Sequence, residues 1–457
     1  MTKKIIKDFD KRSQKEIQQQ MNDCFNLIKP KFQPPLDPGF RPPVLANRNF
    51  LKEVEDSGEG VPLVIALERP DGTISRFETR VYHEIHSRAR ASLAYAERIF
   101  KFLLWSRGGW RAYLGGPRSI GEHIAECYAP KGVRAYDYYL LGESVYGKTF
   151  EIKICRPSEV PPAHERGHQI GRHLDGCRIG FDLGASDRKV SAVIDGQAVW
   201  SEEVMWEPQA QPDPEYHYRE IMTALRAASL KLPRLDAIGG SAAGIYVDNV
   251  VRVGSLFRRV RDEDYDQVRG LFLRMADEVG VPFEVANDGD VTALAGSMSL
   301  EDNGVLGIAL GSSEACGYVD GEGYLTGWLN ELAFAPVDYN PEAVVDDWSG
   351  DVGCGAQYFS QQAVFRMAAK AEIFLPADMA PAERLKFVQE KLESGHKGAR
   401  RIWESIGVYM GYSLAHYADF YDIKHFLILG RCTSGRGGEI ILEKAREVIE
   451  AEFPELA

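Results

Sequence analysis

The chain is poor in cysteine and has no long apolar run. Its seven cysteines are an odd number without a C-x-x-C pair, which indicates reduced thiols rather than a disulfide framework. No stretch approaches the roughly 18 apolar residues that a membrane helix needs, and the polar residues 1–20 contain no apolar signal-peptide core. We therefore expect a cytoplasmic protein with no membrane partner.

The overall composition is that of a folded protein. Hydrophobic residues make up 44% of the chain, charged residues 26% and aromatic residues 11%, which excludes disordered, collagen-like and coiled-coil chains. At 457 residues the chain is roughly two to three times as long as a typical domain. The sequence therefore predicts two or three folded units.

The net charge of −13 is unevenly distributed. Residues 1–177 contain 28 Lys and Arg against 22 Asp and Glu, a net charge of +6, whereas residues 178–457 contain 26 against 45, a net charge of −19. An acidic body repels phosphate backbones, and no short helix-turn-helix can be placed in the front region. We therefore do not expect nucleic acid as a partner of the second part, and the mildly basic front region gives only weak support for one.

The front region, residues 1–177, is predicted to be an α+β region of unknown role. A charged helix leads into the proline-rich arm 29–43, which must be extended and which we expect to pack over a neighbouring surface. Residues 61–82 alternate around a Pro-Asp-Gly turn and predict a β-hairpin. A helix over 86–106 and a final strand complete the region.

From residue 178 the pattern predicts two or three antiparallel strands followed by alternating helices and strands. Such an order implies mixed sheets covered by helices. The expected later elements are a helix over 214–233, a strand and glycine loop over 235–247, a helix over 264–281, a strand over 282–288, a helix over 291–298, a strand over 305–311, a hairpin over 317–327, a long helical stretch over 356–420, a strand over 424–430 and a last helix over 438–451.

Five short motifs lie along this second part of the chain. They are Asp182-Leu183-Gly184-Ala185-Ser186, Asn287-Asp288, Gly311-Ser312-Ser313, Asn330-Glu331 and the run after Gly430. In type and order they resemble the ROK (repressor, open reading frame, kinase) sugar kinases of the actin-like ATPase superfamily. The resemblance implies an α/β fold of two ribonuclease-H-like lobes, residues 178–295 and 296–457, with the front region added.

For the first motif the resemblance implies binding of ATP and Mg²⁺. Asp182 would hold Mg²⁺ through water, and a glycine turn at Gly184 and Ser186 would let backbone N–H groups approach phosphate oxygens. Lys189 follows where a cation could meet the γ-phosphate, although charged residues are equally common on the surface of a strand. A plain hairpin turn is the alternative interpretation of this motif.

For the second motif the resemblance implies the sugar site. Asp288 would accept the proton of the attacking hydroxyl, and Asn287 and Gly244 would contact the sugar, with Glu331 accepting a sugar hydroxyl. Phosphoryl transfer asks the protein mainly to position groups, with one carboxylate orienting the nucleophile. By itself, Asn-Asp before a helix is also typical of an ordinary N-cap.

The phosphate and adenosine motifs of the second lobe depart from the family pattern. Gly311, Ser312 and Gly430 are assigned to the nucleotide, but Glu314 follows closely, and a carboxylate about 4 Å from a γ-phosphate would repel it by roughly 4 kcal/mol. Either Glu314 points away, or it shares a cation, or ATP is not bound in the usual way. The glycines after Gly430 predict a flexible loop, and the helix behind it could offer its N-terminus to an anion.

The residues of the family's structural zinc site are mostly missing. Phe334 replaces the histidine that touches sugar and zinc, Asp347 and Ser349 replace two cysteines, and only Cys354 remains. Ala356 replaces a glutamate that would contact the sugar. We therefore do not expect structural zinc.

Two functions follow from these motifs. The first is ATP-dependent phosphorylation of a sugar or sugar derivative, with Asp288 as the general base. The alternative is a catalytically inactive, sugar-binding or regulatory protein of the same fold, because a fold does not determine a function. The resemblance also implies a homodimer.

Overall fold

The computed structural model describes residues 26–168 and 170–457, and the predicted charged helix near the N-terminus lies outside them. The chain forms two compact units. The first unit contains residues 168–303 and 317–325, and the second contains the described residues up to 167 together with 304–316 and 326–457. The predicted segments 1–177, 178–295 and 296–457 do not coincide with these units, and as functional segments they remain a prediction.

The first unit is built on a five-stranded sheet with the order β12-β9-β6-β7-β8. Strands β6, β7 and β8 are antiparallel neighbours, whereas β9 runs parallel to β6 and β12 parallel to β9. This order is that of a ribonuclease-H-like lobe, which confirms the predicted fold class. The strands are β6 (Cys177–Leu183), β7 (Asp187–Ile194), β8 (Gln197–Met205), β9 (Ala237–Ala242) and β12 (Phe283–Asn287).

Helices and a small hairpin complete the first unit. The core lies between the sheet and these helices, where Phe181, Phe272 and Met275 are buried. The predicted helix over 264–281 is broken at Gly270, which separates α8 from α9. The elements are α7 (Pro214–Ser229), β10 (Ile245–Val247), β11 (Val250–Val253), α8 (Tyr265–Arg269), α9 (Leu271–Val279) and α10 (Asp288–Leu300).

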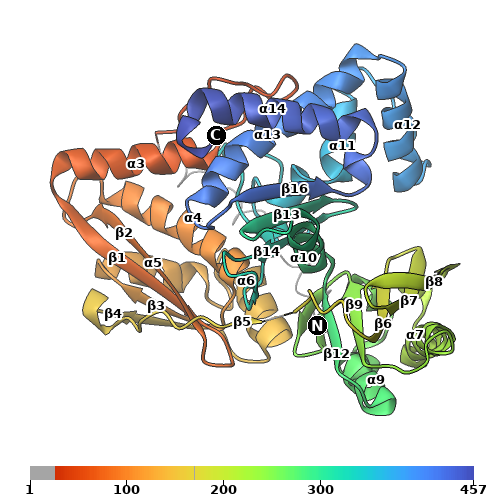
Figure 1. The fold of residues 1–457 in the computed structure, drawn as a ribbon. Helices are drawn as coiled ribbons and strands as arrows, with labels where there is room; N and C mark the ends of the chain where they lie inside the picture. Colours follow the sequence, from red (N-terminus) through yellow and green to blue (C-terminus); the bar gives the residue numbers. More distant parts are fainter. Residues whose placement is uncertain (1–25, 169) are drawn as a thin grey trace. The chain divides into compact units, whose positions relative to one another are not determined.

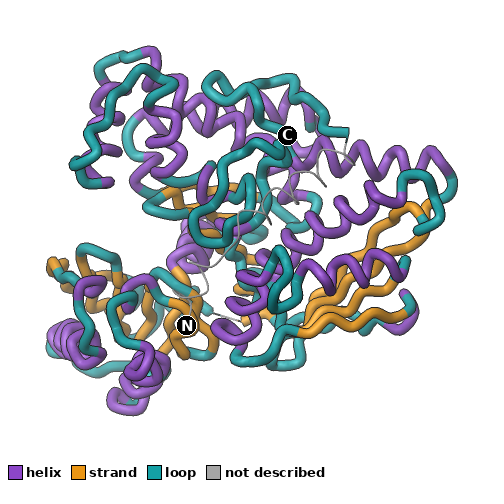
Figure 2. The backbone as a smooth tube through the Cα atoms, turned by 180° about the vertical axis from the view of Figure 1, so that it is seen from behind, coloured by secondary structure: helices purple, strands orange, loops and turns teal. Residues whose placement is uncertain are grey.

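The front region contributes a four-stranded sheet, in the order β2-β1-β3-β4, to the second unit. The hairpin of β1 and β2 confirms the prediction for residues 61–82. Helices cover one face of this sheet (Figure 2), and Val64 and Ala66 pack against Val160 on the other. The elements are α3 (Pro43–Ser57), β1 (Gly60–Glu68), β2 (Ile74–Tyr82), α4 (Ala89–Arg107), β3 (Arg111–Gly115), α5 (Arg118–Cys127), α6 (Ala135–Tyr139), the π-helix Leu140–Tyr146 and β4 (Glu151–Cys155).

The second five-stranded sheet has the order β16-β13-β14-β15-β5. Boundaries between the two units fall within β5, β14 and β15. Strand β13 pairs parallel with β16, and α13 packs beside α14 (Figure 1). The predicted helical stretch over 356–420 contains three helices: Pro381 begins the second of them, and Gly395, with a φ of +84°, lies between the second and the third. The elements are β5 (Gly167–His168), β13 (Val305–Leu310), β14 (Glu314–Val319), β15 (Leu325–Thr326), α11 (Gln361–Ala368), α12 (Pro381–Glu393), α13 (Lys397–Ala418), β16 (His425–Leu429) and α14 (Arg436–Glu452).

The proline-rich arm packs onto helices of the second unit, as predicted. The Asp37 carboxylate accepts a hydrogen bond from the Tyr409 hydroxyl at 2.6 Å and pairs with Arg366 at 3.1 Å. The backbone N–H of Arg41 donates to the carboxylate of the buried Asp338 at 2.9 Å. The arm therefore joins the front region to the C-terminal helices within one unit.

No helix in the described ranges has the length and apolar character needed to cross a bilayer.

Candidate functional site

The predicted phosphate turn of the first unit connects β6 to β7. The Gly184 N–H donates to the Asp187 carbonyl oxygen at 3.0 Å, and the Gly184 carbonyl oxygen accepts from the Trp206 indole at 2.8 Å. The Ser186 hydroxyl donates to the Asp187 carboxylate at 2.9 Å. These bonds fix the turn as a rigid hairpin and engage the Gly184 N–H that the sequence assigned to phosphate.

Lys189 lies directly across the hairpin from Asp182. Its ammonium group is 3.0 Å from the Asp187 carboxylate and 3.5 Å from that of Asp182. The hydrogen bond to Asp187, together with the charge of Asp182, raises the pKa of Lys189. The lysine therefore stays charged and, being half exposed, can also meet an anion of a ligand.

The predicted sugar residues Asn287 and Gly244 are bonded to each other. The Asn287 side-chain amide donates to the Gly244 carbonyl oxygen at 2.5 Å, and its own carbonyl oxygen accepts from the Gly289 N–H at 2.7 Å. The second bond makes Asn287 the N-cap of α10, so the structural interpretation of this motif holds. Contact with a sugar stays a prediction for both residues.

Asp288 is the first residue of α10 and is partly buried. Burial, and then the negative charge of Asp182, raises the pKa of the Asp288 carboxyl. Burial, and then the charge of Asp288, raises the pKa of Tyr246, a partly exposed side chain of β10. The first unit therefore holds two carboxylates whose charges interact, one near the end of β6 and one at the start of α10.

The residues around Asp182 fit a hydrated Mg²⁺. After burial, the negative charge of Asp182 contributes to raising the pKa of Asp288, and a divalent cation would relieve that repulsion. Carboxylates are the protein ligands that Mg²⁺ prefers. No group of three or more His, Cys, Asp or Glu side chains is arranged to hold a metal directly within residues 26–168 and 170–457.

In the second unit, the two predicted nucleotide turns lie at the same edge of the sheet. Gly430 directly follows β16 and has a φ of +102°, and a Cβ atom there would stand 2.5 Å from the Leu310 carbonyl oxygen. The Cys432 thiol lies 3.7 Å from the Gly311 carbonyl oxygen. Because β13 and β16 are parallel, their carboxyl ends bring Gly311 and Gly430 together, and the neighbouring Ser312 is exposed.

The glycines behind Gly430 serve close packing, contrary to the predicted flexible loop. A Cβ atom on Gly437 would stand 2.4 Å from the Trp403 indole nitrogen, and one on Gly438 would stand 2.6 Å from the Thr433 carbonyl oxygen. At the N-terminus of α14, the Glu393 carboxylate accepts the Arg436 N–H at 3.1 Å. The Glu393 carboxylate therefore already occupies the anion-binding position at the N-terminus of α14.

Glu314 points into the interior of the second unit and is only 3% exposed. One of its carboxylate oxygens lies 2.2 Å from the place where a Cβ of residue 355 would stand, which Gly355 leaves free. Burial, and then the charge of Glu331, raises the pKa of Glu314 to about 8, so this side chain is protonated at neutral pH. Of the three predicted possibilities, Glu314 pointing away is the one that the structure shows.

The segment that carries Glu331 is held by the end of α4 from the front region. The amides of residues 329–331 donate in antiparallel order to the carbonyl oxygens of residues 105–107, at 3.0–3.3 Å. Asn330 has a φ of +51° and accepts a hydrogen bond from the Tyr421 hydroxyl at 3.1 Å. Glu331 itself is partly exposed, as a sugar-hydroxyl acceptor must be.

A buried ion cluster fixes the loop 346–354, which aligns with the zinc loop of the resembled family. The Asp351 carboxylate lies 3.1 Å from Arg98, 3.2 Å from Lys101 and 2.5 Å from Arg134, and these four side chains are at most 2% exposed. Burial opposes ionisation of Asp351, but the charges of Arg98 and Lys101 outweigh it and lower its pKa. Charged groups of the front region thus hold a loop in which Cys354 is the single thiol.

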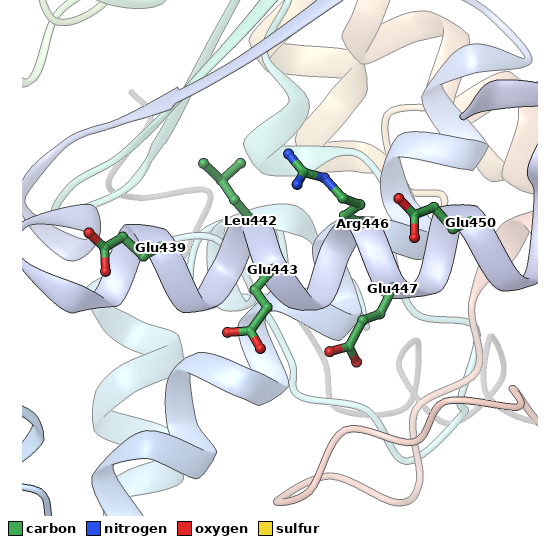
Figure 3. A pocket seen from close by; sticks show the side chains of 6 residues that line it. All are labelled: Glu439, Leu442, Glu443, Arg446, Glu447 and Glu450. Carbon is green, nitrogen blue, oxygen red and sulfur yellow. The ribbon is translucent and has the colours of Figure 1, made fainter.

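A shallow hollow of about 330 Å³ runs along α14 (Figure 3). Its lining comes from this one helix, and Glu447 is already paired with Lys444 at 2.7 Å. We interpret it as a solvated helix face. The lining residues are Glu439, Leu442, Glu443, Arg446, Glu447 and Glu450.

Sequence reasoning missed the groups that support these sites. Trp206, whose indole donates to the Gly184 carbonyl oxygen, lies 22 residues after the motif that it supports, and no local pattern marks it. Arg98 and Lys101 lie on a helix whose apolar face was recognised, but charged residues on such a helix are normally exposed. Their burial follows from Asp351, about 250 residues later.

Among known proteins, only solved structures show a similarity to this chain. No family model matches the chain, and no curated protein matches it. A ROK-family glucokinase from Streptomyces griseus, in complex with glucose and AMPPNP, is 22% identical, with 60% of this chain and 88% of that chain covered and a TM-score of 0.46. A ROK hexokinase from Thermus thermophilus is 19% identical, with 60% and 89% covered and a TM-score of 0.46.

A third structure is a ROK-family transcriptional regulator, a homologue of the E. coli MLC protein. It is 17% identical, with 65% of this chain and 75% of that chain covered and a TM-score of 0.49. The family of these three structures is the one that the sequence motifs resemble.

Proposed function

We propose that this protein is an ATP-dependent kinase of a sugar or sugar derivative, with Asp288 as the general base. The observation that carries the proposal is the placement of Asp288 at the start of α10, partly buried and close to Asp182. A carboxylate that is harder to ionise than usual is a stronger base toward a hydroxyl proton. Asn287, fixed by Gly244 and by its capping bond, lies next to it and would orient the sugar.

The residues of the β6–β7 hairpin would bind the phosphates of ATP. Lys189 would pair with a phosphate oxygen, and Gly184 and Ser186 form the tight turn beside it. Asp182 would hold Mg²⁺ through water. When bound, this ion neutralises phosphate charge during phosphoryl transfer.

In the second unit, Glu331 would accept a sugar hydroxyl, and the turns at Gly311, Ser312 and Gly430 would contact the nucleotide. The protonated state of Glu314 supports the proposal, because it removes the charge that would repel a phosphate. A cytoplasmic location and a homodimer belong to the proposal as well.

The test is ATP consumption by the full-length protein over a panel of hexoses and amino sugars. Wild type should consume ATP with at least one sugar, and Asp288→Asn should lose nearly all of this activity while still binding the sugar. Asp266→Asn is the matched control, since Asp266 is an exposed carboxylate of the same unit. Equal activity of wild type and Asp288→Asn would remove Asp288 as the base.

The second candidate is a catalytically inactive sugar-binding or regulatory protein. Two observations favour it: the Gly184 N–H is engaged within its own turn, and Glu393 lies at the N-terminus of α14. Sugar binding by calorimetry without ATP consumption on any sugar would support this candidate over the kinase.

A further inference from the structure

Three aromatic side chains form a cluster next to the segment that carries Glu331. The Phe334 ring lies 4.4 Å from the Trp105 ring and 5.8 Å from the Tyr136 ring, measured between centroids. Trp105 and Tyr136 are buried, whereas Phe334 is partly exposed. Phe334 therefore presents the outer face of an aromatic wall whose inner part comes from the front region.

The Glu331 carboxylate belongs to the same neighbourhood. Phe334 follows it within one 3-10 turn, in which the Phe334 N–H donates to the Glu331 carbonyl oxygen at 3.2 Å. Burial is the main cause that raises the pKa of Tyr136, and the charge of Glu331 is one of several carboxylate charges that contribute to the rise. Glu331 and Phe334 are both partly exposed and stand three residues apart in one 3-10 turn, a spacing that brings side chains to the same side.

The front region holds this wall in a fixed position. The Trp105 indole donates to the Asp137 carboxylate at 3.1 Å, and Lys101 lies 3.0 Å from the same carboxylate. The backbone bonds between residues 105–107 and 329–331 tie the wall to the Glu331 segment. A wall fixed in this way binds without a large ordering cost.

We propose that Phe334, backed by Trp105 and Tyr136, selects a deoxy sugar, one in which a hydrogen or methyl group replaces a hydroxyl on the side that meets this wall. The inference rests on the proposed function, in which Glu331 accepts a neighbouring hydroxyl. A hydroxyl pressed against the Phe334 ring would lose its water without gaining a partner, whereas a C–H or methyl group packs on the ring. Apolar sites of this kind discriminate by roughly tenfold to a hundredfold.

Calorimetric binding to the full-length protein tests this. The probes are glucose, mannose and galactose, each beside its set of monodeoxy derivatives. At least one deoxy derivative should bind roughly ten to a hundred times more tightly than its parent sugar. The inference is overturned when every parent binds as tightly as, or more tightly than, its deoxy derivatives.

Variants connect the preference to the wall. Phe334→Asn should lose the preference, Phe334→Leu should keep most of it, and Phe374→Asn, at a residue 82% exposed elsewhere in the second unit, should leave it unchanged. Thermal unfolding of each variant checks that it is folded. A preference that survives in folded Phe334→Asn, or disappears equally in Phe374→Asn, would overturn the assignment.

ATP consumption with the same probes separates this inference from the proposed function. If a deoxy sugar binds more tightly but no sugar is phosphorylated, the proposed kinase activity is refuted and the proposed selectivity of Phe334 is supported. If parent sugars are phosphorylated and no deoxy derivative binds more tightly, the kinase activity is supported and the proposed selectivity of Phe334 is refuted. If no sugar binds at all, both the proposed kinase activity and the proposed selectivity are refuted.

Discussion

The Asn287 side-chain amide donates to the Gly244 carbonyl oxygen at 2.5 Å and thereby links the start of α10 to the loop after β9. Gly244 has a φ of +142°, and a Cβ atom there would stand 2.3 Å from the Val253 carbonyl oxygen. Only glycine fits this position without strain. The two residues that the motifs assign to the sugar thus also support the local fold.

Asn287→Ala should lower the free energy of unfolding by about 1 kcal/mol more than Asn287→Ser does, because serine can still cap α10. Neither variant can make the bond to Gly244, so the comparison isolates the cap. Urea unfolding of the two variants measures the difference. Equal stability of the two would show that the capping bond to Gly289 contributes nothing.

Glu314→Gln should change how stability depends on pH. The pKa of Glu314 is raised to about 8 in the folded protein, above its usual value near 4.5, so between these values the folded state holds one more proton than the unfolded state. Stability should therefore fall as pH rises through this window, and the loss should be complete above about pH 8. Glutamine carries no such proton and should remove this part of the pH dependence.

Thermal unfolding of wild type and Glu314→Gln at pH 5, 7 and 9 provides the measurement. The variant should gain stability relative to wild type between pH 5 and pH 9. Burial also raises the pKa of Asp338, to about 7, so the stability of both proteins falls with pH for this second reason. The effect of Glu314 is therefore measured as the difference in stability between wild type and variant at each pH. Parallel curves would contradict the assignment.

Asp351→Asn should destabilise the protein by about 3–5 kcal/mol, because it leaves Arg98, Lys101 and Arg134 without their shared buried carboxylate. Asp347→Asn is the matched control in the same loop, where the carboxylate is exposed. Chemical unfolding of both variants gives the comparison. A small and equal effect of the two substitutions would show that the ion cluster does not stabilise the loop.

Gly430→Ala should cost more stability than Gly395→Ala. Both glycines have positive φ, +102° and +84°, but a Cβ at Gly430 would meet the Leu310 backbone at 2.5 Å, while nothing lies within 4 Å at Gly395. Gly430, with a ψ of 170°, also lies in a backbone region that essentially only glycine adopts, so the excess combines this strain with the close contact to Leu310. Similar losses in urea unfolding would mean that the Gly430 turn relaxes freely.

Local patterns predicted most of the elements because their causes lie within a few residues. The alternation over residues 61–82 and the turn at Gly72 specify the β1–β2 hairpin, and capping at Asn287 marks the start of α10. Helix α3 and the strand β11 were missed. Pro381 should have marked the start of a new helix within the predicted helical stretch over 356–420.

The sequence by itself determined the sparse cysteine content, the acidic second part and the order of the motifs, since these depend only on residue type and spacing. Only the tertiary structure showed how loop 346–354 is held in place. The charged side chains that pair with its Asp351 come from α4 and from Arg134, more than 200 residues earlier in the chain. The tertiary structure also decided that Glu314 is buried and protonated. Burial and long-range pairing set a side chain's charge, and neither can be read from its neighbours in the chain.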